Sequence, residues 1–210
     1  MKRIEAINDF VIKFANVNGS GSASANELFV KAVIRMGVPV SPRNIFPSNI
    51  QGLPTWYEVR VSEQGWLGRR GGIDMMVAMN PQTWDTDIAE IEPGGYLFYD
   101  ATRHVPAEKL RPDIEVIGMP LTEISNANYA DPRQRQLFKN IIYVGALSHL
   151  LCVDESVFEK LFSEQYKGKE LLLQSNMKAL RMGRDWMAQN HRSAFGLQVK
   201  AADRVGERIF

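Results

Sequence analysis

Hydrophobic positions along the first two thirds of the chain alternate between short strand-like runs and longer segments with helical spacing. Residues 10–15 form an almost entirely apolar run, which leads to a turn of small residues at 18–23. Beyond the turn, apolar residues share one helical face, at Leu28, Phe29, Ala32, Val33 and Met36. Ser24 and Glu27 have the spacing of a capping box, so we expect this helix to begin at Ser24. The pattern predicts a strand, a glycine turn and a helix.

The remainder of this region repeats the alternation of strands and helices. Residues 55–62 alternate, with Trp56, Glu58 and Arg60 on one face and Tyr57, Val59 and Val61 on the other. Residues 74–79 are a continuous apolar run, as in a buried parallel strand, and 96–100 and 114–118 predict two more strands. Between them, Pro81 would begin a short helix bearing Trp84, Ile88 and Ile91. Strands separated by helices indicate an α/β fold with a mostly parallel, Rossmann-like sheet flanked by helices.

The last third of the chain is predicted to be helical. Asp131 before Pro132 has the form of an N-cap followed by a first-turn proline, and Asp154 can cap a second helix. One apolar stripe runs along the first of these helices, at Leu137, Ile141, Val144, Leu147 and Leu151. Gly145 within this stripe would allow a close helix contact. A final helix is expected over about 169–189.

Length and composition favour one globular domain. The chain has 210 residues, of which 45% are hydrophobic and 23% charged, with a net charge of +1. A charge this small gives no reason to expect a strong electrostatic field that would attract nucleic acids or membranes. We expect a single domain over 1–210, with an α/β part at about 8–125 and a helical part at about 131–200. The tail, 200–210, has few apolar residues and is expected to be mobile or to lie on a partner.

Metal-binding and membrane-spanning segments are not apparent in the sequence. The single cysteine, Cys152, cannot form an internal disulfide and cannot alone hold an iron–sulfur cluster. This fits the reducing cytoplasm, where we expect the protein to be localised. His104, His149 and His191 lie far apart without metal-ligand spacing, so no metal site is expected. Neither a signal peptide nor an apolar run of about 20 residues is apparent.

The small-residue turn is the principal candidate for chemistry. A strand–turn–helix junction directs free backbone N–H groups and the positive end of a helix to one point, where phosphate groups bind. The candidate contacts are Asn18, Gly19, Ser20, Gly21 and Ser22. These residues lack the full G-x-G-x-x-G spacing and the Lys-Ser or Lys-Thr of a P-loop. A turn whose glycines only permit close packing therefore stays open as an alternative.

Two further segments are candidates for ligand or partner contacts. The first, 43–54, is long for a connection, rich in amides and stiffened by two prolines, and long irregular loops are often functional. The second, Arg69-Arg70-Gly71-Gly72, could bind an anion or could be a solvated basic turn. No G-x-S-x-G motif or paired carboxylates stand out, so no self-sufficient catalytic site is expected.

Several motifs together carry a family resemblance over about residues 8–200. The sequences FVIKFANVNGSGSASANELFVKAVIRMG and PSNIQGLPTWYEVRV are continued by DMMVAMNPQTW and PGGYLFYDAT. The chain resembles the gamma domain of 2-oxoacid:ferredoxin oxidoreductases, most closely the type at the N-terminus of the 2-oxoglutarate:ferredoxin oxidoreductase alpha chain. Its turn differs from the G-x-G-G-Q-G loop of the stand-alone gamma subunits.

The resemblance implies a function that the residues alone do not give. The family decarboxylates a 2-oxoacid such as 2-oxoglutarate on thiamine diphosphate, which is held with Mg²⁺. It passes electrons through [4Fe–4S] clusters to ferredoxin and transfers the acyl group to coenzyme A (CoA). The thiamine-binding and iron–sulfur parts lie in other domains or subunits, and the gamma domain helps to enclose the CoA and active-site region.

Carried onto this chain, the resemblance gives each candidate segment a role. It makes the turn at 18–22 the candidate CoA contact. It makes Arg43, Ser48, Asn49 and Gln51 candidates for the wall that faces the active site or a partner subunit. This chain would be required for activity but would not be catalytic alone.

Two other functions remain open at this stage. One is a stand-alone Rossmann-like nucleotide-binding module, although the expected second strand at 38–40 carries no Asp or Glu for an NAD ribose. The other is a scaffold subunit that binds no ligand. The family type most resembled continues into a longer alpha chain, and we expect the present chain to be a separate subunit.

Overall fold

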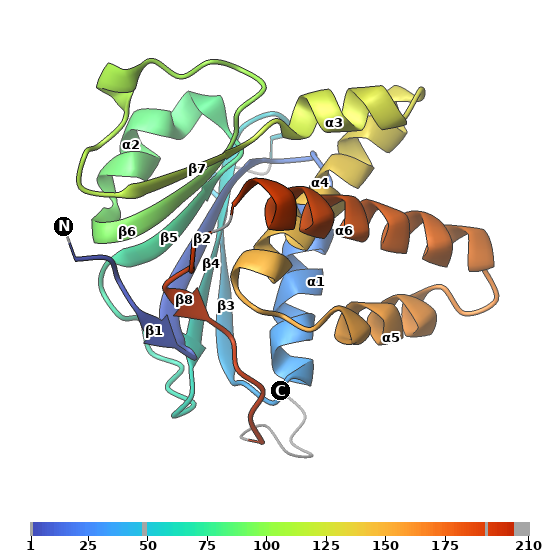
Figure 1. The fold of residues 1–210 in the computed structure, drawn as a ribbon, viewed down its shortest axis with the longest axis horizontal. Helices are drawn as coiled ribbons and strands as arrows, with labels where there is room; N and C mark the ends of the chain where they lie inside the picture. The colour runs from blue at the N-terminus through green and yellow to red at the C-terminus, as the bar shows by residue number, and fades with distance from the viewer. Residues whose placement is uncertain (1, 48–49, 192, 204–210) are drawn as a thin grey trace.

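The computed structural model describes residues 2–47, 50–191 and 193–203, which form a central sheet covered by helices (Figure 1). In these residues the sheet has the strand order β3-β4-β2-β5-β6-β7. Its strands are β2 (Asp9–Val17), β3 (Val40–Ile45), β4 (Pro54–Ser62), β5 (Ile73–Ala78), β6 (Ile91–Asp100) and β7 (Glu115–Met119). The helices are α1 (Ser22–Arg35), α2 (Trp84–Ala89), α3 (Leu121–Asn128), α4 (Pro132–Leu150), α5 (Glu155–Gln165) and α6 (Glu170–Asn190), with short 3₁₀ turns η1 (Pro81–Thr83) and η2 (Ala107–Lys109).

The predicted mostly parallel α/β sheet is confirmed. Among its described strands, only β4 runs antiparallel to its neighbours. Strands β2, β5, β6 and β7 pair in parallel, whereas β4 is antiparallel to both β2 and β3. Strand β3 is therefore parallel to β2, and α1 crosses over the intervening strand β4. The strand order reverses between β2 and β5, because the chain leaves β2 toward β3 and leaves β5 toward β6. In open α/β sheets such a reversal marks the place where ligands bind.

Two boundaries differ from the sequence prediction. Residues 40–45 were expected to lie largely in an irregular loop, but they form the edge strand β3. The strand was missed because its side chains are polar and because it contains Pro42, which an edge strand tolerates since one of its sides has no ladder to complete. Ile91 was expected on a helix but is the first residue of β6. The strand then continues through Pro93.

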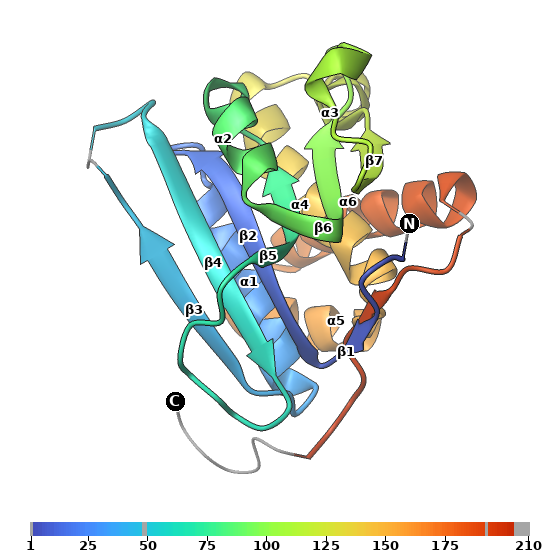
Figure 2. The same cartoon turned by 90° about the vertical axis from the view of Figure 1, so that its left-hand side faces the viewer.

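The two faces of the sheet are covered differently (Figures 1 and 2). Helices α1, α4, α5 and α6 cover one face over the larger core, and the smaller helix α2 lies on the other. The predicted alternation of β4 is confirmed, since Tyr57, Val59 and Val61 enter the larger core while Trp56 packs against the smaller cluster. No helix in the described ranges is long and apolar enough to cross a membrane.

The predicted helical third is confirmed, together with its two caps. Asp131 accepts a hydrogen bond from the backbone N–H of Gln134 at 2.9 Å, and Asp154 accepts one from that of Ser156 at 2.9 Å. The close contact predicted at Gly145 is also present, because an added Cβ atom there would overlap the backbone oxygen of Leu180 on α6. Two long helices thus approach each other closely through a small residue.

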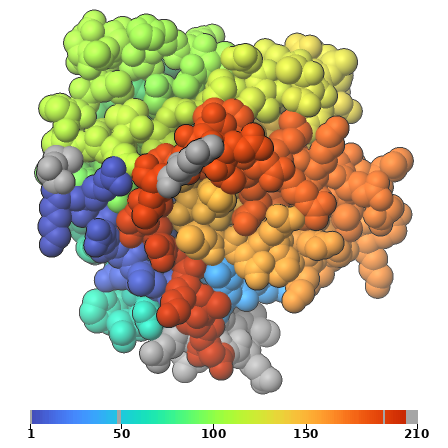
Figure 3. All heavy atoms as spheres, viewed as in Figure 1, coloured from blue at the N-terminus to red at the C-terminus, as the bar shows by residue number. Residues whose placement is uncertain are grey.

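The chain ends are joined by contacts that the sequence did not reveal. Strands β1 (Ala6–Ile7) and β8 (Leu197–Gln198) pair in parallel, and Figure 3 shows the segment before residue 204 running along the surface beside the N-terminal residues. The backbone N–H of Ala202 donates to Met36 O at 2.8 Å. The tail was expected to be mobile or to lie on a partner; its residues 200–203 instead pack on their own domain, and 204–210 lie outside the described residues.

Gly145→Ala should lower the free energy of unfolding by about 2 kcal/mol, because the new methyl group has no room between α4 and α6. Urea unfolding would show this as a lower midpoint. The matched control is Gly71→Ala, where no heavy atom lies within 4 Å of an added Cβ atom. Equal midpoints for the two variants would contradict the close helix contact.

Candidate functional site

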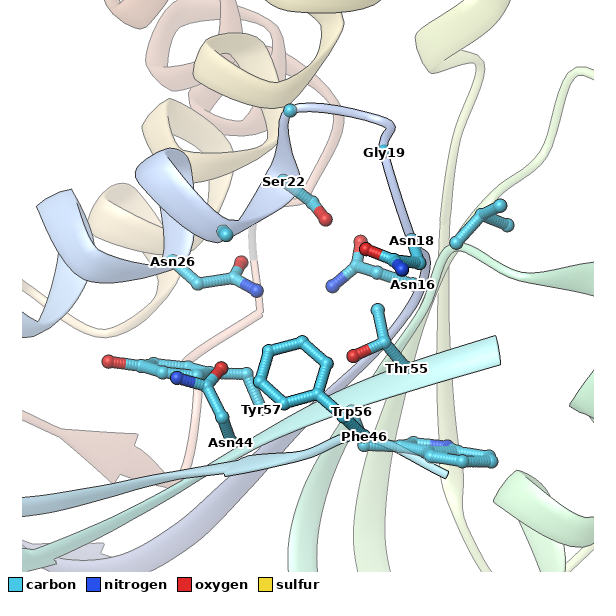
Figure 4. Close-up of a pocket in the computed structure, with 13 residues that line it drawn as sticks. Asn16, Asn18, Gly19, Ser22, Asn26, Asn44, Phe46, Thr55, Trp56 and Tyr57 are labelled. Carbon is cyan, nitrogen blue, oxygen red and sulfur yellow. The ribbon is translucent and has the colours of Figure 1, made fainter. Parts of the chain in front are cut away.

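A cavity of about 380 Å³ lies where the carboxyl end of β2 meets the start of α1. The opposite side of the cavity comes from the β3–β4 hairpin (Figure 4). Its lining residues are Asn16, Val17, Asn18, Gly19, Gly21, Ser22, Ala23, Asn26, Asn44, Phe46, Thr55, Trp56 and Tyr57. Among the described residues, the lining contains amides, hydroxyls and aromatic rings but no lysine or arginine.

Two glycines give the turn its shape. Gly19 and Gly21 have φ values of 82° and 76°, a left-handed conformation that side chains other than glycine rarely adopt. Gly21 is the N-cap residue, and α1 begins at Ser22 without a side-chain cap. The predicted capping box is therefore wrong, because the glycine turn starts the helix before Ser24 is reached. The first-turn N–H groups remain without a side-chain acceptor at the positive end of a helix.

Helix α4 holds the turn in place. The carbonyl oxygen of Ser20 accepts hydrogen bonds from Asn140 Nδ2 at 2.9 Å and from Gln136 Nε2 at 3.2 Å. The Ser20 hydroxyl donates to Ser22 Oγ at 3.0 Å. The helical third of the chain therefore fixes the direction in which the turn presents its N–H groups.

A buried amide facing the cavity has an unused donor. Asn16 is 3% exposed, and its Nδ2 has no hydrogen-bond partner among the described residues. An unsatisfied buried donor costs about 1–3 kcal/mol, so its persistence needs an explanation. Asn16, Ser22, Asn26 and Thr55 face the same space in Figure 4. These groups together suit a ligand with several oxygen acceptors.

The buried phenol of Tyr143 orients the second amide, Asn26. Tyr143 donates to Asn26 Oδ1 at 2.7 Å, which leaves the Asn26 amide nitrogen for the cavity. Burial raises the pKa of Tyr143 well above its ordinary range, so its hydroxyl remains a donor. Burial, together with the charge of Glu27, raises the pKa of Tyr57 to about 12. Both phenols are neutral at physiological pH and do not repel an anion.

The structure brings the predicted turn together with part of the predicted loop. Asn18, Gly19, Gly21 and Ser22 line the cavity, whereas Ser20 supports the turn from behind. A Cβ atom at Gly19 would lie 2.7 Å from Gln51 Cγ, so Gln51 packs on the turn. Hydrogen bonds tie the two segments, with Asn18 N donating to Leu53 O at 2.8 Å and Gly52 N to Asn18 O at 3.0 Å. Ser48 and Asn49 lie outside the described residues.

The predicted arginine candidates lie away from this cavity. Arg43 is exposed opposite Glu58 in the strand register, whereas its neighbour Asn44 is opposite Tyr57 and lines the cavity. Because successive strand residues point to opposite faces, Arg43 faces the other side of the sheet. Arg69 is bound through two nitrogens to Glu58, with Nε–Oε1 at 3.1 Å, and Arg70 pairs with Asp74. These two arginines are already neutralised by carboxylates.

Sequence reasoning missed the residues that supply the interior donors. Asn26 had a usable signal, since it lies on the same helical face as the apolar Phe29 and Val33, and a polar residue there needs a partner. Asn16 follows an apolar run and had no comparable signal. The described residues hold no group of three or more His, Cys, Asp or Glu side chains that could bind a metal ion.

The chain is similar in sequence to subunits of 2-oxoacid oxidoreductases. It is 22% identical to 2-oxoacid:ferredoxin oxidoreductase 2 subunit alpha of Aeropyrum pernix, over 90% of this chain and 34% of that one. It is 24% identical to ketoisovalerate oxidoreductase subunit VorA of Methanothermobacter thermautotrophicus, over 56% of this chain and 23% of that one. The chain therefore spans about a third or less of the length of these relatives.

Solved structures share the fold. The chain superposes with a TM-score of 0.82 on 2-oxoglutarate:ferredoxin oxidoreductase from Magnetococcus marinus with 2-oxoglutarate, coenzyme A and succinyl-CoA bound, at 22% identity over 94% of this chain and 34% of that one. The pyruvate oxidoreductase subunit PORC of Thermotoga maritima gives 0.67, at 18% identity over 85% of this chain and 96% of that one.

A gamma subunit of known structure has nearly the extent of this chain. The gamma subunit of a keto/oxoacid ferredoxin oxidoreductase from Geobacter sulfurreducens gives a TM-score of 0.65, at 20% identity over 86% of this chain and 99% of that one. The family described as pyruvate ferredoxin/flavodoxin oxidoreductase matches residues 11–186, which is most of the chain. As the sequence motifs predicted, the protein belongs to the pyruvate ferredoxin/flavodoxin oxidoreductase family.

Proposed function

We propose that this chain is the gamma component of a 2-oxoacid:ferredoxin oxidoreductase complex and that the cavity at the start of α1 contacts CoA. The complex would convert a 2-oxoacid such as 2-oxoglutarate to acyl-CoA and CO₂ and pass the electrons to ferredoxin. Thiamine diphosphate, Mg²⁺ and [4Fe–4S] clusters would be held by partner subunits. The chain would act as one domain over 1–210 and would not be catalytic alone.

The unpartnered Asn16 donor is the observation that carries the CoA contact. Asn16 Nδ2 is buried beside the uncapped start of α1, where the donors converge. Phosphate oxygens can accept several N–H bonds at once, and CoA carries a diphosphate. Recognition by neutral donors also fits a cavity whose described lining residues include no arginine or lysine. The bound CoA in the Magnetococcus marinus relative supports the same assignment.

We further infer that the β3–β4 hairpin forms part of the wall around this region. Phe46, Ile50 and Leu53 are 49%, 65% and 39% exposed, so the hairpin offers apolar surface beside the cavity. Gln51 packs on Gly19, and Ser48 and Asn49 lie in the same connection. Arg43 would meet a partner from the opposite face of the sheet.

Gly21→Val should raise the Kd for CoA about tenfold, because valine at φ 76° would distort the turn that aims the N–H groups. CoA-dependent turnover should fall while the complex stays assembled. Gly168→Val is the matched control, since Gly168 has the same φ of 76° and no atom within 4 Å of an added Cβ atom. Unchanged CoA binding and turnover in Gly21→Val would remove the turn from the site and favour a scaffold that binds no ligand.

Asn16→Leu should weaken CoA binding without lowering the free energy of unfolding. Replacing an amide whose donor is unused should keep or raise the free energy of unfolding, by about 1 kcal/mol at most, while CoA affinity falls about tenfold. Urea unfolding and calorimetric titration of the assembled complex would measure the two effects. Asn176→Leu serves as control, because Asn176 Nδ2 donates to Leu172 O at 2.8 Å. A loss of stability in Asn16→Leu with unchanged CoA affinity would contradict the assignment.

A further inference from the structure

A second cavity of about 260 Å³ opens at the carboxyl ends of β5 and β6. Residues from the ends of both strands, the start of α2, the start of α3 and the middle of α4 line it. We propose that this cavity binds an anion that carries a flat ring, with the ring against an aromatic wall and a phosphate or carboxylate on two cations. The argument uses only the walls of this cavity and stands apart from the proposed CoA contact.

Trp84 and Tyr99 form the aromatic wall. Their ring centroids are 5.4 Å apart at an interplanar angle of 75°, so the two rings brace each other edge to face. The Trp84 indole is also fixed by a hydrogen bond from Nε1 to Lys109 O at 3.3 Å. Met79, Pro81 and Val105 add apolar lining. A volume of about 260 Å³ suits one ring system rather than a whole cofactor.

Lys139 is the inner of the two cations. Its Nζ lies 3.3 Å from Thr122 Oγ1 and 3.8 Å from Asp100 Oδ2, and its side chain is 23% exposed. An ammonium group has three donors, so the hydrogen bond to Thr122 leaves others for a ligand. The side chain is thus positioned by neighbouring groups while part of its charge remains accessible.

Arg103 is the outer cation. It lines the cavity and is exposed, and in the described part of the chain no carboxylate or hydrogen-bond acceptor pairs with it. This distinguishes Arg103 from Arg69 and Arg70, which are held by Glu58 and Asp74. A guanidinium group without a partner at the edge of a cavity suits a phosphate or carboxylate.

Asp100, the one carboxylate among the described lining residues of this cavity, is already fully engaged. Asp100 accepts hydrogen bonds from the backbone N–H and hydroxyl groups of both Thr102 and Thr122. Burial opposes its ionisation, but these hydrogen bonds outweigh burial and lower the pKa of Asp100. The carboxylate holds the two lining loops in place, and two cations against one bound carboxylate leave the cavity with positive charge.

Two kinds of molecule share this chemistry. One is a nucleotide fragment, and the other is a free aromatic acid. Ala15, Ala78 and Tyr99 are register partners on adjacent parallel strands, so both cavities open at the same edge of the sheet. The ends of β2 and β6 are two strand spacings apart, about 10 Å. A long nucleotide-bearing ligand could therefore enter both cavities, whereas a small aromatic acid would fill only the second.

The test is a titration of the full chain with adenosine 3′,5′-bisphosphate and, separately, with phenylpyruvate, followed by the four tryptophan indole N–H signals in NMR spectra. We expect one probe to shift the Trp84 signal while Trp186 on α6 stays unchanged. Arg103→Gln and Lys139→Gln should each weaken this binding about tenfold. Arg133→Gln, an exposed arginine at the start of α4, should leave it unchanged.

Each outcome decides the proposal. A Trp84 shift with the bisphosphate identifies a nucleotide ligand, and a shift with phenylpyruvate identifies an aromatic acid. The proposal is overturned if neither probe shifts Trp84 at millimolar concentration, or if only Trp56 of the first cavity responds. Equal affinity in Arg103→Gln, whose side chain is exposed and not needed for folding, would also overturn it.

Discussion

The two-sided pairing of β2 is the constraint on which the rest of the structure depends. This strand pairs antiparallel with β4 from Asp9↔Ser62 to Val17↔Pro54, and parallel with β5 from Ile12↔Met75 to Ala15↔Ala78. A slip of one residue would exchange the faces of the strand, which would turn Lys13 toward the larger core and Phe10, Ile12 and Phe14 away from it. The same register places Asn16 at the end of the strand, beside the turn and facing the first cavity. Pairing of β5 with β6 then sets the position of the second cavity.

The face of the sheet opposite the larger core is organised by charges. Lys13, Glu58 and Arg60 are each less than one tenth exposed, and they pair with Glu90, Arg69 and Asp9 respectively. Buried ion pairs add little net stability, but removal of one partner leaves an uncompensated charge. Lys13, Arg60 and Arg69 are therefore committed to carboxylates, whereas Arg43 on the same face is exposed. The cavity at the start of α1 lies on the other face, where backbone and amide N–H groups supply the donors.

Much of the fold follows from local rules that act within a few residues. The Asp131 and Asp154 caps, the continuous apolar run of β5 and the alternation of β4 were all predictable for this reason. Strand β3 was not predictable, because its place at the edge of the sheet permits a polar, proline-containing sequence that reads as a loop. The capping box failed because the left-handed Gly21 is the N-cap, three residues before Ser24.

The site was predictable only in part, since it is assembled from distant segments. The glycine turn has a local signature, and its motif led to both the candidate site and the family. Asn16 becomes significant only when α1 and the β3–β4 hairpin enclose it, and the side of the sheet that Arg43 faces depends on its register with Glu58. The second cavity is lined by residues from separate elements, so no single sequence motif predicts it. These residues include Trp84, Tyr99, Arg103 and Lys139.

The most direct test of the central claim is gentle anaerobic purification of this chain from its source, with identification of the proteins and cofactors that accompany it. The account predicts partner subunits that carry thiamine diphosphate and iron–sulfur clusters. It also predicts that the purified complex reduces a viologen dye with a 2-oxoacid only when CoA is present. A chain that purifies alone, without cofactors or this activity, would contradict the proposed function and leave the cavity at the glycine turn as the site of a separate binding module.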